Sequence, residues 1–174
     1  VTDWGGLIDV LDALPAKCKP VTVCLFWQDV LDGNDEPFVE AGYKVVSAGY
    51  LQDPDFLYRL IHLFSTHRYS ASNGPGSNVF YSVAAGVPYF FVSEIPEERL
   101  RIEGPEEEVA QYLQTDDGWD RMREIRSAFS EIRDDITPEQ REMTDYYLGR
   151  SRFKTPAKLN WDLRTAESLM WGRR

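Results

Sequence analysis

The residues best suited to chemistry lie in one short segment, Ser70 to Asn78, which reads SASNGPGSN. Gly74 and Gly76 allow a backbone to approach a ligand without an intervening side chain. Ser77 and Asn78 place short hydrogen-bonding groups at the first turn of the helix that the following apolar residues predict. Because a helix start exposes unpaired N–H groups and partial positive charge, the segment predicts a site for a phosphate or pyrophosphate.

An ordinary turn is the alternative interpretation of this segment. Gly, Pro, Asn and Ser are also the commonest turn residues, and Ser77 has the right type for a simple helix cap. The segment matches neither the P-loop nor the dinucleotide-binding fingerprint. No Gly-Lys-Ser/Thr follows the glycines, and the first strand-helix unit carries no dinucleotide fingerprint.

Four short apolar runs alternate with helical stretches and predict the strands that position this loop. They are Val21 to Trp27, Lys44 to Ala48, Tyr69 to Ser72 and Tyr89 to Val92. The first run is apolar throughout, which predicts a strand buried on both faces, with Cys24 as a small buried residue inside it. Strands that alternate with helices indicate an α/β fold with a doubly wound, Rossmann-like parallel sheet. Ligands of such sheets bind beyond the carboxyl ends of the strands, where the loop lies.

The rest of the chain predicts helices and no second core. We expect one α/β domain over residues 1–174, with a sheet core at 1–95 and a mainly helical extension at 96–174. Asp53-Pro54 and Thr137-Pro138 each combine a cap residue with a proline at the first helical position, so each predicts a helix start. Gln140 completes a capping box with Thr137.

Composition excludes several classes of function. The 174 residues carry a formal net charge of −10, which argues against a chain that grips nucleic acid phosphates or an anionic membrane surface. No apolar stretch is long enough to span a membrane. The two cysteines, Cys18 and Cys24, form neither a zinc pattern nor a disulfide framework, which favours a reducing, cytoplasmic setting. We expect no metal and no cofactor.

A wider pattern surrounds the loop. Gly76-Ser77 opens a helix of small and apolar residues, and Ala85-Gly86-Val87-Pro88 leads into an apolar strand. This arrangement resembles the donor-binding segment of GT-B glycosyltransferases, in which a Gly-Ser turn opens the helix that holds the donor phosphates. The resemblance covers roughly residues 21–92. It implies the nucleotide-sugar-binding, C-terminal domain of an enzyme of polysaccharide or glycoconjugate biosynthesis, with the nucleotide-sugar as substrate.

The resemblance also implies roles for particular residues. The phosphates would be bound by Asn73, Gly74, Gly76, Ser77 and Asn78, with His67 and Arg68 as candidate basic residues, and Glu94 and Asp29 as candidate contacts to sugar or ribose. His67 is also read as a cation at a helix C-terminus, and Asp29 as a cap of the next turn. Catalytic residues are unknown, because the base of such enzymes comes from an acceptor-binding domain that we expect upstream of Val1.

Two further functions fit the same sequence. One is half of a nucleotide-sugar epimerase-like protein, which differs in chemistry but shares the loop. The other is a Rossmann-like or flavodoxin-like binding domain without catalysis.

Overall fold

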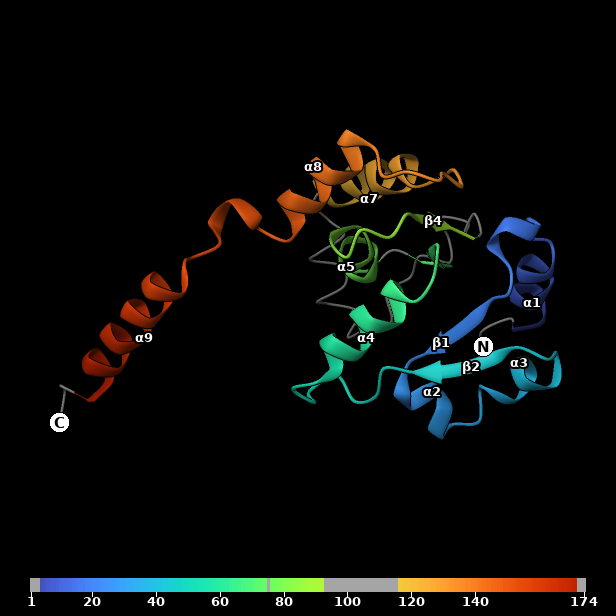
Figure 1. Ribbon diagram of the computed structural model, residues 1–174, viewed down its shortest axis with the longest axis horizontal. Coiled ribbons are helices and arrows are strands. Elements are labelled where there is room, and N and C mark those ends of the chain that lie inside the picture. Colours follow the sequence, from blue (N-terminus) through green and yellow to red (C-terminus); the bar gives the residue numbers. More distant parts are fainter. Residues whose placement is uncertain (1–3, 75, 93–115, 172–174) are drawn as a thin grey trace.

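Two parallel strand pairs form the centre of the computed structural model, which describes residues 4–74, 76–92 and 116–171 (Figure 1). β1 (Thr22–Leu25) pairs with β2 (Lys44–Ser47), and β3 (Ser70–Ser72) pairs with β4 (Tyr89–Phe91). Both pairs are parallel, and helices connect their strands. The predicted α/β class with parallel strands is therefore confirmed.

The first pair is stabilised by an apolar core between its strands and two helices. α1 (Trp4–Asp12) leads through the short 3-10 turn η1 (Ala16–Cys18) into β1. α2 (Trp27–Leu31) and α3 (Glu36–Glu40) connect β1 to β2. Phe38 of α3 is fully buried in one cluster with Leu11 and Leu25. Complete burial of such a side chain contributes about 1.5–3 kcal/mol, which holds the helices on the strands.

The second pair has two faces with different surroundings. α4 (Phe56–Ser65) precedes β3, and α5 (Asn78–Ala84) connects β3 to β4. Because side chains alternate along a strand, Ser70, Ser72, Tyr89 and Phe91 share one face, and Ala71 and Phe90 share the other. α5 covers the first face, where the Ser70 hydroxyl donates to Ser82 Oγ at 2.5 Å. Ser82 in turn donates to the carbonyl of Val87 at 2.9 Å.

Two C-terminal helices complete the cover on the α5 side. α7 (Asp116–Ala128) ends next to Phe129, whose fully buried ring packs edge-on against Tyr89 with centroids 5.7 Å apart. The Phe91 N–H donates to the carbonyl of Phe129 at 3.0 Å. α8 (Pro138–Tyr147) packs beside α5 and α7. These contacts attach the helical extension to β4 through both side chain and backbone.

The last helix extends away from this body. α9 (Pro156–Trp171) follows the 3-10 turn η3 (Arg150–Arg152) and projects outward (Figure 1). Its described side chains are mostly exposed, including Leu159, Trp161 and Leu163. Within the described ranges, no helix combines the length and the hydropathy needed to cross a bilayer.

The strands form two separate pairs where the sequence predicts one sheet. Among the described strands, β1 pairs with β2 alone and β3 with β4 alone. The predicted burial of Cys24 is wrong, because its side chain is exposed. The first run is also shorter than predicted, since β1 ends at Leu25 and Trp27 begins α2. The exposure of Cys24 shows that part of this face of β1 is left uncovered, whereas helices cover both faces of a central strand in a doubly wound sheet.

The two predicted helix starts have different outcomes. Thr137 caps α8 as predicted, since its hydroxyl accepts from the Gln140 N–H at 3.2 Å and the Gln140 side chain accepts from the Thr137 N–H at 3.0 Å. The prediction for Asp53-Pro54 is wrong by about one turn of chain. The Asp53 carboxylate does accept from the Asp55 N–H at 2.8 Å, as a cap would, but residues 53–55 form a turn and α4 begins only at Phe56.

Phe129→Ala should lower the free energy of unfolding by about 3–5 kcal/mol, because it leaves a cavity beside Tyr89. Urea denaturation followed by circular dichroism measures this change. Phe153→Ala is the control, since that side chain is 70% exposed and should change stability little. Equal effects of the two substitutions would contradict the packing of α7 on the second strand pair.

Candidate functional site

The Gly-rich loop lies at the carboxyl end of β3, as the sequence predicts. It joins Ser72, the last residue of β3, to Asn78, the first residue of α5. Ser77 is the cap residue, but its exposed side chain makes no capping hydrogen bond. The N–H groups of Ser77 and Asn78 have no hydrogen-bond partner among the described residues. The loop therefore offers both a hydroxyl and backbone donors to a ligand.

Gly76 is required by a close approach within this loop. A Cβ atom there would lie 2.7 Å from Oδ1 of Asn78, closer than side-chain contacts allow. The backbone of Gly76 is not left-handed, so any side chain is opposed by space rather than by backbone strain. Substitution must displace the Asn78 side chain, which is hydrogen-bonded to Tyr89.

Hydrogen bonds between hydroxyl and amide groups connect the loop to β3 and β4. The Ser72 hydroxyl donates to the carbonyl of Gly74 at 2.5 Å and is hydrogen-bonded to the Tyr89 hydroxyl. Burial raises the pKa of Tyr89 to about 12, although hydrogen bonds to Ser72 and Asn78 and the charge of Arg126 act in the opposite direction. Tyr89 is thus a neutral phenol that links β4 to both ends of the loop.

Arg126 of α7 also belongs to this site, and the sequence analysis missed it. Its guanidinium group lies over the ring of Phe91, 5.4 Å from the centroid. Nε and one terminal nitrogen are buried without a hydrogen-bond partner in the part of the chain that the structure describes. Arg126 is nearly 50 residues from the loop and differs in no local way from Arg121 or Arg123, so sequence spacing carried no signal for it.

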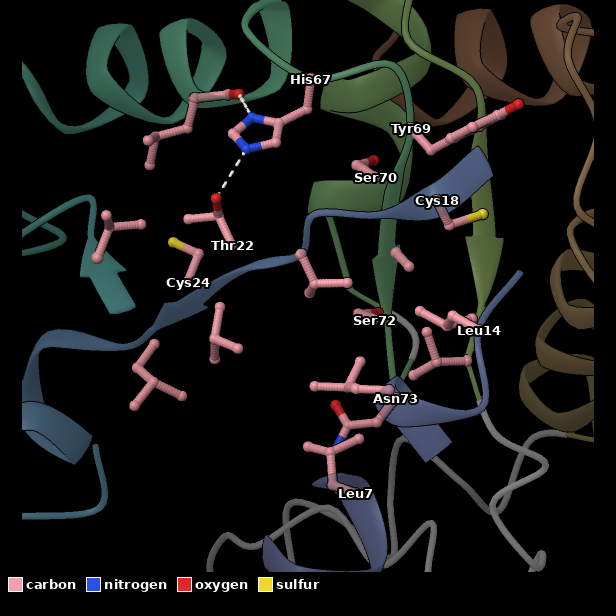
Figure 2. Close-up of a pocket in the computed structure, with 18 of the residues that line it drawn as sticks. Leu7, Leu14, Cys18, Thr22, Cys24, His67, Tyr69, Ser70, Ser72 and Asn73 are labelled. Carbon is pink, nitrogen blue, oxygen red and sulfur yellow. Dashed lines mark hydrogen bonds between the residues drawn. The ribbon is translucent and has the colours of Figure 1, made fainter. Parts of the chain in front are cut away.

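A cavity of about 360 Å³ lies between β1 and β3, beside the loop (Figure 2). Its wall is mainly apolar and is formed by α1, β1, α4, β3 and β4. The residues that line it include Leu11, Val23, Leu25, Phe64, Ala71 and Phe90. Asn73 of the loop and Asp29 of α2 line it at the carboxyl ends of the strands. Small-molecule sites have this size and this mixture of apolar wall and few polar groups.

The structure does not bring His67 and Arg68 to the loop. Both precede β3 and therefore lie at its amino end, with the strand between them and Asn73. His67 bridges α4 and β1, through Nδ1 to the Leu63 carbonyl at 2.7 Å and through Nε2 to Thr22 Oγ1 at 3.0 Å (Figure 2). Arg68 pairs with Asp134 at 3.4 Å. Their geometry fits structural contacts and not the predicted phosphate contact.

The candidate sugar contacts have different positions. Asp29 lines the cavity, and its carboxylate also accepts from the Asn34 side chain at 3.3 Å. Glu94 lies outside the described residues.

No family model, no curated protein and no solved structure matches this chain. In the ranges that the structure describes, no three His, Cys, Asp or Glu side chains gather as metal ligands.

The buried phenol of Tyr89 predicts a pH dependence. Because its folded-state pKa of about 12 exceeds the ordinary 10, the unfolded chain loses this proton first, and stability should fall as pH rises from 10 towards 12. Tyr89→Phe should reduce this fall, since phenylalanine has no proton to lose. Urea denaturation of both proteins across that pH range measures the difference. Parallel stability curves would contradict the burial of this hydroxyl.

Proposed function

We propose that this chain is the nucleotide-sugar donor-binding domain of a glycosyltransferase that makes polysaccharides or glycoconjugates. The observation that carries the proposal is the position of the Gly-rich loop. It follows a parallel strand, opens onto a helix and adjoins a cavity of about 360 Å³. Phosphates would bind at Gly74, Gly76, Ser77 and Asn78, and the rest of the donor would extend along the cavity past Asn73.

The strand connections support this location. The chain runs from β1 to β2 and from β3 to β4, and in a single sheet with β1 next to β3 the connection from β2 to β3 would pass beyond β1. In doubly wound sheets, ligands bind outside the carboxyl ends at the point where the order reverses. We propose that the two pairs belong to one such sheet, with the order β2-β1-β3-β4 and the donor at the junction of β1 and β3.

The charge distribution is compatible with an anionic donor. The net charge of −10 opposes long-range attraction of phosphates. Salt screens that field over about 8 Å, so donors in direct contact with the ligand decide the affinity. The loop supplies N–H, hydroxyl and amide donors and contains no carboxylate.

The remaining parts of the proposal concern the whole enzyme. Transfer would require an upstream acceptor-binding domain that supplies the catalytic base. Glu94 and Asp29 stay candidates for contact with the sugar or ribose. We expect the enzyme to act in the cytoplasm without a metal or cofactor.

The proposal predicts unequal effects of two substitutions in the loop. Ser77→Ala should weaken nucleoside diphosphate binding by about 1 kcal/mol, roughly fivefold, because it removes one hydrogen bond and leaves the backbone donors. Gly76→Val should abolish measurable binding, because its side chain displaces Asn78. Calorimetric titration with a panel of nucleoside diphosphates measures both.

Ser130→Ala is the control, since that hydroxyl only donates to the Ser127 carbonyl on the exposed end of α7. The proposal fails if the wild-type protein, including any upstream domain, binds none of the panel. Equal binding by Gly76→Val would place the nucleotide elsewhere.

A further inference from the structure

We propose that Arg126 of α7 binds the phosphate anion at the Gly-rich loop. In the free protein, two nitrogens of its guanidinium group are without hydrogen-bond partners among the described residues, and the anion would supply them. This inference rests on the proposed function, because it assigns the cationic ligand of the same site. It replaces His67 and Arg68, which lie at the other end of β3.

The first observation is the state of the guanidinium group. Nε and one terminal nitrogen of Arg126 are buried and lack hydrogen-bond partners in the described part of the chain. None of the ion pairs among these residues includes Arg126. Other arginines either pair with a carboxylate, as Arg59, Arg123 and Arg150 do, or are exposed to water. These two nitrogens have lost contact with water without gaining a hydrogen bond, which costs free energy, and the ring of Phe91 offers the group only a cation-π contact.

The second observation is the position of the group. Phe91, which lies beneath the guanidinium, is opposite Ser72 in the parallel ladder. Both are the last residues of their strands, so Arg126 lies at the carboxyl end where the loop begins. Arg126 and α5 also lie on the same face of the strand pair, since Phe91 beneath Arg126 shares a face with Tyr89, which is hydrogen-bonded to Asn78 of α5.

The neighbouring groups indicate the chemical class of the ligand. The Ser77 and Asn78 N–H groups and the Ser77 hydroxyl are donors, and no Asp or Glu occurs between Ser70 and Val92. A guanidinium group donates through a planar fork that matches two oxygens of one phosphate. Several donors around one cation fit a diphosphate better than a single carboxylate, so pyrophosphate is the minimal probe.

Arg126→Met tests the inference because it retains much of the side-chain volume and removes the charge. Without ligand, this variant should melt at a higher temperature than the wild type, since the two buried nitrogens that lack hydrogen bonds are gone. Its affinity for inorganic pyrophosphate should fall by roughly tenfold to a hundredfold, as expected for a hydrogen-bonded charge. Calorimetry and thermal melts of the whole chain, with and without pyrophosphate, give both values.

Two variants complete the experiment. Arg123→Met lies on the same helix, removes an exposed arginine and should retain wild-type affinity. Arg126→Lys keeps the charge without the fork and should bind pyrophosphate with intermediate affinity.

The inference is overturned if Arg126→Met binds pyrophosphate as tightly as the wild type. In that case nucleoside diphosphates can still bind at the loop, and the proposed function stands. A lower melting temperature or loss of folding in Arg126→Met also overturns it, because the arginine would then be a structural residue that is already compensated. If the wild type binds neither pyrophosphate nor any nucleoside diphosphate, both proposals fail.

Discussion

The packing of Phe129 against Tyr89 is the contact on which the arrangement around the loop depends. Phe129 is fully buried, and its carbonyl also accepts the N–H of Phe91. These contacts fix the end of α7 on β4, and Arg126 lies one helical turn before them. The same ring closes the face on which Tyr89 supports the loop. A helix from the C-terminal half thereby takes part in a site whose other members are close in sequence.

Electrostatics in this protein is local. Most of the ion pairs among the described residues lie at the surface, where each contributes about 0–1 kcal/mol and is screened by salt. They stabilise the fold little, and in each pair a carboxylate neutralises the cation. Any anion must therefore be held by groups in direct contact with it, and the donors of the loop provide such groups in a chain of net charge −10.

The two strand pairs are not hydrogen-bonded to each other among the described residues, and a cavity lies between them. An isolated pair of strands is only marginally stable, so each pair depends on the helices that cover it. The free edges of β1 and β3 line the cavity, and the hydrogen bond from His67 to Thr22 connects α4 to β1 across it. A ligand at this position would contact both halves of the fold at once.

The sequence by itself determined the features that depend on residues close together in the chain. The parallel α/β class, the capping box at Thr137 and the loop that opens α5 all follow from local patterns of apolar and cap residues. Only the tertiary structure decided the exposure of Cys24, the separation of His67 from the loop and the position of Arg126 over Phe91. These outcomes depend on which strands pair and where a distant helix packs. The contact of His67 with Thr22 joins residues 45 positions apart, and no periodicity within a segment encodes such a contact.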